Sequence, residues 1–357
     1  MMNDQVRVLV VDDSAYNRRT IIKMLETIPG VEVVGYAVNG EEGLRKVFDL
    51  KPDLITLDLE MPRMDGFSFL RVVMQNRPTP VIVVSARSED ENVFRALEFG
   101  AVEFVAKPSA RVSPELFSIQ EDLLQKVRTI ARTDMKKVLN RPAPGTAGPL
   151  RQAAKIRAAD GEQINQVVIA ASTGGPPALQ AILSAIREPI PLGIAIAQHM
   201  PPGFTKAFAD RLNKYCPLEI REARSGDRMR PGTVLVAPGA KNLLFRRRGD
   251  EVLAEVVEPA ANQRYTPSAD VLFTSASEIF GSRLLGVVLT GMGNDGARGV
   301  VSIKEEGGAV LAEAESSSVV FGMPKEAIAT GKVDKIVPLP QMGGAILHRC
   351  GFGRYSA

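Results

Sequence analysis

The sequence predicts an α/β protein made of two doubly wound domains. In the first 130 residues, and again after residue 164, short apolar runs alternate with amphipathic segments. This pattern is typical of a parallel sheet covered by helices on both faces. Between the two regions the periodicity is lost, and Pro, Gly, Ala and basic residues become frequent, as in a linker. We therefore expect two domains at 1–130 and 164–345, a linker at 131–163 and a tail at 346–357.

The first domain is expected to contain five parallel strands with helices between them. The strands are near-continuous apolar runs, and the intervening segments repeat apolar residues at helical spacing. The expected strands are residues 6–11, 31–37, 54–59, 81–86 and 103–107. The expected helices are residues 14–28, 40–50, 66–76 and 92–100, and a last helix beginning at about Pro114.

Polar side chains stand where these apolar runs end. Asp12 and Asp13 close the first strand, Asp58 closes the third, Ser85 the fourth and Lys107 the fifth. The carboxyl ends of parallel strands meet at one edge of a sheet, where three carboxylates would repel one another unless a cation joins them. Such oxygen ligands suit Mg²⁺, and the nearby hydroxyl and ammonium groups could hold a phosphoryl group on Asp58.

Residues 5–128 resemble the receiver domain of two-component response regulators. The resemblance lies in the acidic pair, Asp58, the MPRMDG segment after it, Ser85 and the KP pair at 107–108. The alternative is that these residues are only the solvated polar ends of strands. Five residue types would then have to match the pattern at five places by coincidence. The resemblance implies a flavodoxin-like fold and phosphorylation of Asp58 by a histidine kinase. It also implies Mg²⁺ at Asp12, Asp13 and Asp58, and switch roles for Ser85, Phe104 and Lys107.

The second domain repeats the alternation of strand and helix. We expect a mostly parallel sheet with an inserted hairpin, because residues 242–258 form two strand-like runs around a Gly-Asp turn. The other expected strands lie in residues 166–171, 192–200, 232–239 and 283–313, the last range also containing a Gly-rich loop and a helix. Two further helices are expected at 177–186 and 201–215.

Three reactive side chains follow strands of this domain: Ser172, His199 and Asp295. A serine hydroxyl becomes a nucleophile when an imidazole takes its proton, and a carboxylate can orient that imidazole. The chain has only one other histidine, His348. We expect the three groups to converge at the carboxyl edge of the sheet. The order Ser, His, Asp differs from that of α/β-hydrolases, but a triad is defined by its geometry.

The segment STGG at 172–175 has other interpretations. Ser172 could simply cap the following helix, and GMGNDG at 291–296 could simply be a turn. STGG could also bind phosphate, although the sequence has neither the lysine of a Walker A motif nor a GxGxxG pattern there. For catalysis, the two glycines would let substrate approach the backbone, with Thr173 and Met292 on the oxyanion side.

Six segments of this domain resemble the catalytic domain of chemotaxis protein-glutamate methylesterases. They are ASTGGPPAL, AQHMPPGFTKAFADRLN, GDRMRPGTVLVAPG, PSADVLFTSAS, LTGMGNDGARG and SSSVVFGMPKEAI. The resemblance implies Ser172 as nucleophile, His199 as base, Asp295 as its orienter, and Thr173 and Met292 at the oxyanion side. It implies hydrolysis of glutamate methyl esters on chemoreceptors, with release of methanol, and deamidation of receptor glutamines. Ala170 departs from an expected glycine and Asn242 from a frequent histidine, which puts only local binding at Asn242 in doubt.

Composition narrows the remaining possibilities. Basic and acidic residues nearly balance, 44 against 41, and Trp is absent, so we expect no nucleic-acid partner. No run is long enough to span a membrane, and Cys216 and Cys350 have no metal-ligand spacing. We expect a cytoplasmic, monomeric protein that is not membrane-embedded, with no cofactor in its catalytic domain. The alternatives are a non-enzymatic regulator whose second domain binds a partner, and, with less support, a DNA-binding output.

Overall fold

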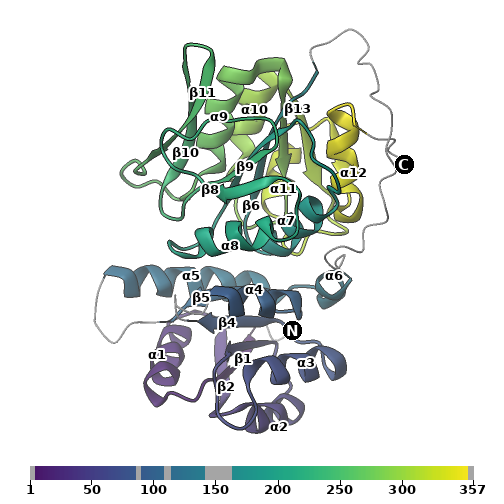
Figure 1. The fold of residues 1–357 in the computed structure, drawn as a ribbon. Coiled ribbons are helices and arrows are strands. Elements are labelled where there is room, and N and C mark those ends of the chain that lie inside the picture. The colour runs from purple at the N-terminus through teal and green to yellow at the C-terminus, as the bar shows by residue number, and fades with distance from the viewer. Residues whose placement is uncertain (1–4, 86–89, 108–113, 141–162, 353–357) are drawn as a thin grey trace. The chain divides into compact units, whose positions relative to one another are not determined.

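The computed structural model describes residues 5–85, 90–107, 114–140 and 163–352, and it contains two compact units that divide after residue 140 (Figure 1). Each unit is described separately. Most of the predicted linker lies outside the described residues, and so does a helix that the segment at 150–159 suggests. The boundaries of linker and tail therefore stay predictions.

The first unit contains the predicted five-stranded sheet. All of its strand pairs are parallel, and the strand order is β2-β1-β3-β4-β5. The central strands are almost wholly buried, which explains their unbroken apolar sequences. The strands are β1 (Val6–Val11), β2 (Val31–Ala37), β3 (Leu54–Asp58), β4 (Val81–Ser85) and β5 (Glu103–Ala106).

Helices cover this sheet, with α1 packed on α5 and α2 packed on α3. Four of them begin at a side chain that accepts a hydrogen bond from the first turn: Ser14, Asn39, Asp65 and Asp134. The last, α6, lies inside the predicted linker but belongs to the first unit, because Met135 and Val138 are buried. The helices are α1 (Ala15–Glu26), α2 (Gly40–Leu50), α3 (Gly66–Asn76), α4 (Asp90–Glu98), α5 (Pro114–Ile130) and α6 (Met135–Leu139).

The second unit contains a seven-stranded sheet that is parallel throughout, in the order β14-β13-β12-β6-β7-β9-β8. The predicted hairpin is a separate antiparallel pair, β10 (Asn242–Arg248) and β11 (Glu251–Val257). The predicted α/β architecture with an inserted hairpin is confirmed. The strands of the large sheet are β6 (Gln166–Ala171), β7 (Gly193–Gln198), β8 (Glu219–Glu222), β9 (Thr233–Val236), β12 (Leu284–Val288), β13 (Ala309–Glu313) and β14 (Lys335–Val337).

Helices surround the second sheet as well. A hydrophobic core joins one face of the sheet to α9, α10, α11 and the hairpin, whereas α7 packs on α8 and α12 (Figure 1). Helix α12 continues to Arg349, beyond the predicted start of the tail, because Met342, Ile346 and Leu347 are buried. No helix in the described part of the chain is long and apolar enough to cross a membrane. The helices are α7 (Gly175–Ser184), α8 (Phe204–Asn213), α9 (Ala269–Phe280), α10 (Ala297–Glu305), α11 (Met323–Ala329) and α12 (Leu339–Arg349).

In each sheet the order of connection reverses at one pair of strands. In the first unit the chain passes from β1 outward to β2 and then returns to β3 on the other side of β1. In the second unit it passes from β6 through β7 to β8 and β9, and later returns to β12 on the other side of β6. Loops leave the sheet in opposite directions at such a reversal, so a crevice forms between them. The carboxyl ends of β1 and β3, and of β6 and β12, are therefore where sites are expected.

The close packing of α9 on α10 can be tested at Gly299. A methyl group added there would overlap Phe273, whose side chain is fully buried in α9. We expect Gly299→Ala to destabilise the second unit by about 1–3 kcal/mol, measured as a lower transition temperature in calorimetry of the full chain. Alanine at an open helical position would instead stabilise by up to about 1 kcal/mol. Glu305→Ala, at an exposed position of α10, is the control and should leave the transition nearly unchanged; an unchanged or higher transition for Gly299→Ala would contradict the packing argument.

Candidate functional site

The first unit gathers three carboxylates at its reversal point. Asp12 and Asp13 follow β1 and Asp58 ends β3, and carboxylate oxygens of the three lie within 4.8 Å of one another. Lys107 follows β5, and its Nζ lies 2.8 Å from Asp58 Oδ1. Asp58 itself is almost fully buried. The predicted acidic cluster and the predicted lysine thus meet in one place.

This cluster fits a cation. Burial, and next the proximity of Asp58, raise the pKa of Asp12 from 3.8 to about 6. Asp12 Oδ1 accepts a hydrogen bond from the backbone of Ser14, but Asp12 Oδ2 is buried and has no hydrogen-bond partner in the described residues. A buried carboxylate oxygen without a donor is costly, and a bound cation would remove that cost.

The other two residues predicted for this site, Ser85 and Phe104, lie on the neighbouring strands. Ser85 ends β4 and is fully buried, and its carbonyl accepts a hydrogen bond of 2.8 Å from the backbone of Lys107. Phe104 lies in the core of β5, where its ring meets that of Phe94 edge-on at 6.4 Å. The structure therefore brings Ser85 to the carboxylate edge of the sheet and places Phe104 in the adjoining core.

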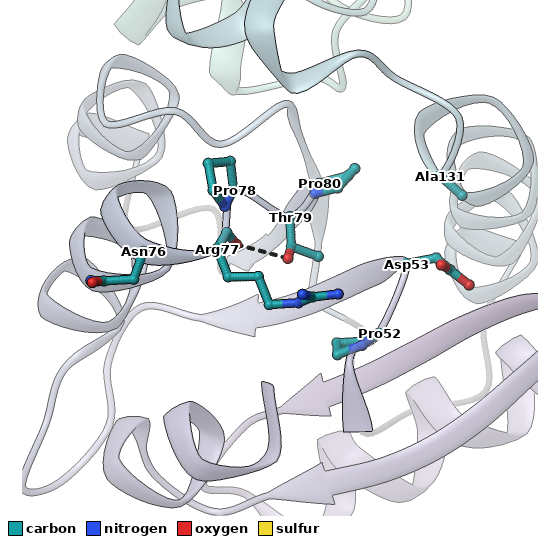
Figure 2. A pocket seen from close by; sticks show the side chains of 8 residues that line it. All are labelled: Pro52, Asp53, Asn76, Arg77, Pro78, Thr79, Pro80 and Ala131. Carbon is teal, nitrogen blue, oxygen red and sulfur yellow. Dashed lines mark hydrogen bonds between the residues drawn. The ribbon is translucent and has the colours of Figure 1, made fainter. Parts of the chain in front are cut away.

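A pocket of about 470 Å³ on this unit lies away from the acidic cluster (Figure 2). Pro52 and Asp53 precede β3, and Thr79 and Pro80 precede β4, so the pocket lies at the amino edge of the parallel sheet. Arg77 extends across it, as Figure 2 shows. Because Asp58 ends β3 at the opposite edge, this pocket is no part of the carboxylate site.

In the second unit, the pairing of β6 with β7 places Ser172 beside His199. Ala171 and Gln198 are partners in the register, and Ser172 and His199 are the residues that follow them. The backbone of His199 donates a hydrogen bond of 3.0 Å to the carbonyl of Ala171. Ser172 is only partly buried, unlike the neighbouring residues Ala171 and Thr173.

His199 is joined to Asp295, as predicted. The distance from His199 Nε2 to Asp295 Oδ2 is 2.8 Å. A neutral imidazole whose Nε2 donates to a carboxylate keeps a free lone pair on Nδ1. Nδ1 is therefore the nitrogen of His199 that is available to accept a proton.

Asp295 is fixed by the first turn of α9. The backbone N–H groups of Ala269 and Asp270 donate to its carboxylate at 2.7 and 3.0 Å, and the Ser268 hydroxyl donates at 3.0 Å. Burial raises the pKa of Asp295, but the hydrogen bond and charge of His199 and the two backbone donors outweigh burial and hold the pKa below its usual value. A carboxylate at a helix N-terminus is also favoured by the helix dipole. Asp295 thus stays ionised in a buried place.

Asp270 of α9 makes the corresponding contact with the start of α10. It lies in the first turn of α9, and its Oδ1 accepts hydrogen bonds from the backbone of Gly296 and Gly299 at the start of α10. Its Oδ2 accepts a hydrogen bond of 2.9 Å from the exposed Arg298. Asp295 lies in the loop just before α10, so the first turn of α9 binds a carboxylate from that loop and the start of α10 binds a carboxylate from α9. This pairing fixes the loop that carries Asp295.

The turn after Ser172 brings the backbone close to Gln198. Gly174 has a φ of 79°, which favours glycine, and a side chain at Gly175 would overlap the Gln198 amide. Gln198 Nε2 donates hydrogen bonds of 3.0 Å to the carbonyls of Ser172 and His199. Gln198 thereby ties the two chain segments together.

The two residues predicted on the oxyanion side lie at the same reversal point. Thr173 is buried in the turn, and its carbonyl accepts a hydrogen bond of 2.9 Å from the Thr290 hydroxyl. Met292 is half-buried in the loop after β12, two residues beyond Thr290. The structure therefore brings Thr173 and Met292 to neighbouring loops at the ends of β6 and β12.

Sequence reasoning missed several residues of this site. Gln198 directly precedes His199. A glutamine that ends an apolar strand sequence is the one local sign that could have marked it. Asp270 lies in the first turn of α9, where an acidic residue is common because it favours the start of a helix. Nothing in the local sequence marks Tyr265, whose ring stacks on that of His199.

The two departures from the expected pattern have structural roles. Ala170 lies in the buried core of the sheet. Asn242 is also buried, and it exchanges two hydrogen bonds of 2.9 Å with Gln263. Its Oδ1 also accepts a hydrogen bond of 3.0 Å from the backbone of Ser268.

Two family models match the chain. Residues 8–114 match the response regulator receiver domain, and residues 167–346 match the CheB methylesterase. A protein from Geobacter sulfurreducens named protein-glutamate methylesterase/protein-glutamine glutaminase 3 is 54% identical over 363 residues, covering 97% of this chain and 98% of its own length. A relative from Myxococcus xanthus with the same name, numbered 1, is 47% identical and covers 96% of both chains.

The fold of the second unit also has a solved counterpart. The crystal structure of the Thermotoga maritima CheB methylesterase catalytic domain is 37% identical, with a TM-score of 0.50, and covers 51% of this chain and 96% of that domain. The sequence matches extend over both units in the same order. The chain therefore belongs to the CheB methylesterase family, in the form that carries a response regulator receiver domain ahead of the methylesterase domain.

Proposed function

We propose that this protein is a phosphorylation-regulated serine hydrolase that removes methyl groups from glutamate methyl esters of chemoreceptors and deamidates receptor glutamines. The observation that carries the proposal is the Asp295–His199 pair beside a partly buried Ser172 at the reversal point of the sheet. The names of the relatives support the same two reactions.

The proposed reaction begins at the Ser172 hydroxyl. Nδ1 of His199 takes the hydroxyl proton while Ser172 Oγ bonds to the ester carbon, and Asp295 stabilises the imidazolium that forms. When the C–O bond to the methoxy group breaks, His199 returns the proton and methanol leaves. Water then attacks the acyl-enzyme with His199 again as base, releasing the glutamate and restoring Ser172. An amide follows the same route with ammonia as the leaving group, which accounts for glutaminase activity.

The carbonyl oxygen becomes negative in the tetrahedral intermediate and needs hydrogen-bond donors. We assign this role to backbone N–H groups at Thr173 and Met292. Pro176 and Pro177, in the first turn of α7, have no N–H group, so the donors on this side must come from the preceding turn. The position of both residues at the reversal point supports the assignment.

In the receiver unit, we assign Asp58 as the phosphate acceptor and a histidine kinase as the phosphodonor. Asp12, Asp13 and Asp58 would hold Mg²⁺, which supplies positive charge against the phosphoryl oxygens when bound. Lys107 already contacts Asp58 and Ser85 lies beside it, so both can bind a phosphoryl group on Asp58. Phosphorylation is expected to relieve an inhibitory effect of this unit on the catalytic site. A cytoplasmic location and a monomeric state stay predictions from the sequence.

Ser172→Ala tests the nucleophile. We expect methanol release from methylated receptor to fall by about 10⁴-fold or more, because no other group replaces the attacking hydroxyl. Circular dichroism should show retained folding. Ser184→Ala, at the other end of α7, is the matched control and should keep its activity. A Ser172→Ala protein that still releases methanol would favour a partner-binding function of this domain instead.

Mg²⁺ binding by the receiver unit can be tested through its pH dependence. The folded pKa of Asp12, about 6, lies above its value of 3.8 in an unfolded chain, so raising the pH through about 6 removes a proton that stabilised the fold. We expect Mg²⁺ to replace that proton and therefore to raise the receiver transition temperature more at pH 7.5 than at pH 5.

Calorimetry of the full chain with and without MgCl₂ measures this effect. Asp12→Asn should abolish most of the Mg²⁺ response, whereas Asp49→Asn, an exposed acidic residue of α2, should not. An equal Mg²⁺ response at both pH values would argue against a site at Asp12.

Regulation can be tested by truncation and by loss of the phosphate acceptor. We expect a chain beginning at Ile164 to release methanol faster than the intact unphosphorylated protein, because the inhibitory unit is gone. A small-molecule phosphodonor with Mg²⁺ should stimulate the intact chain but not Asp58→Asn. Equal or lower activity of the truncated chain would speak against inhibition by the receiver.

A further inference from the structure

The ring of Tyr265 lies against the imidazole of His199. The ring centroids are 5.2 Å apart and the ring planes differ by only 5°. Tyr265 lies in the loop before α9, outside the strand ends that supply Ser172 and His199. We infer that Tyr265 is a positioning residue that fixes the plane of the His199 ring, so that Nδ1 keeps the direction needed to accept the proton of Ser172. The inference rests on the proposed esterase function.

The hydrogen bond to Asp295 leaves one motion of His199 unrestrained. A single hydrogen bond from Nε2 to Asp295 Oδ2 fixes one corner of the imidazole, but by itself it does not fix the tilt of the ring plane about the Cβ–Cγ bond of His199. Turning would change the direction in which the Nδ1 lone pair points. A parallel aromatic ring opposes this motion, because the stacked contact is lost as soon as the planes tilt. The bond and the stack therefore restrain different degrees of freedom.

A hydrogen bond to its backbone carbonyl holds Tyr265 in place. Gln263 Nε2 donates a hydrogen bond of 2.6 Å to the Tyr265 carbonyl, and Gln263 is in turn paired twice with Asn242 at the start of β10. Asn242 also binds the backbone of Ser268, whose hydroxyl contacts Asp295. The Asn242–Gln263 pair thus braces both neighbours of His199, the stacked ring and the carboxylate.

The far edge of the Tyr265 ring meets the loop that carries Met292. Tyr265 Oη lies 3.4 Å from Asn294 Oδ1, and a side-chain carbon at Gly293 would fall 2.9 Å from the ring carbon Cζ. Only glycine leaves room for this contact. Tyr265 therefore spans from the base to the loop assigned to the oxyanion side.

The stack also suits the charge that appears during the reaction. When His199 takes the serine proton it becomes an imidazolium, and the face of an aromatic ring attracts a cation. The charged groups that face this ring pair are Asp295, on His199, and Arg264, whose guanidinium carbon lies 5.1 Å from the Tyr265 centroid. The aromatic face adds to the stabilisation by Asp295 only once the proton has moved, so the effect belongs to kcat.

Tyr265→Leu and Tyr265→Phe in the full chain test the inference. Leucine fills similar space but cannot stack, so we expect kcat for methanol release to fall about tenfold while KM changes less than twofold. Phenylalanine keeps the stack and should rescue most of the lost activity. Tyr215→Leu, at an exposed tyrosine after α8, is the matched control and should behave as the wild type. Wild-type kcat in Tyr265→Leu, or a loss confined to KM, would overturn the inference.

A spectroscopic measurement separates positioning from a loss of folding. The chain has only two histidines, so His348→Gln leaves His199 as the only source of imidazole NMR signals. In that background the ring protons of His199 should be shifted upfield by the tyrosine ring current, and ¹⁵N shifts should report the tautomer protonated on Nε2. Tyr265→Leu should abolish the upfield shift and Tyr265→Phe should keep it; unchanged shifts in Tyr265→Leu would overturn the inference. If the wild type releases no methanol, the proposed function fails, and these shifts still decide whether the rings stack.

Discussion

Both candidate sites depend on one constraint of parallel sheets, which is that a crevice opens where the order of connection reverses. In the first unit the reversal lies between β1 and β3, and it brings Asp12 and Asp13 to Asp58. In the second it lies between β6 and β12, and it places Ser172 next to the loop that carries Asp295. The remaining elements of each site, Lys107 in one and His199 in the other, come from strands on one side of the reversal.

The pKa of the buried carboxylate is shifted in opposite directions in the two sites. Asp12 is buried beside the carboxylate of Asp58, and its Oδ2 has no hydrogen-bond donor among the described residues, so its pKa is raised and the site is suited to a cation. Asp295 has a ring donor, a hydroxyl donor and two backbone N–H donors, so its pKa is lowered despite burial. The first arrangement leaves room for charge to be bound and released, as reversible phosphorylation requires. The second fixes a permanent negative charge beside His199, as a proton-transfer site requires.

The architecture, and the meeting of Ser172, His199 and Asp295 at one edge of the sheet, could be predicted because they follow from local patterns. An apolar run that ends in a serine, a histidine or an aspartate marks a strand and its polar end together. The strands β8 and β14 were not predicted. EIRE is short and mostly charged, and KIV has only three residues, so neither stands out as a buried apolar run. Tyr265 was not predicted because its partner His199 is far away in sequence and its loop has no periodicity. Contacts of that kind depend on the assembled fold, so no window of sequence contains them.

The same reasoning changes the interpretation of Asn242. As a departure from an expected histidine, it cast doubt on local binding, yet its side chain is buried and makes three hydrogen bonds within the protein. Its Nδ2 donates to Gln263, and its Oδ1 accepts from both Gln263 and the Ser268 backbone. An imidazole offers one donor and one acceptor on opposite sides of a ring and could not make all three bonds. Asn242 therefore belongs to the hydrogen-bonded framework that holds Tyr265 and Asp295 against His199.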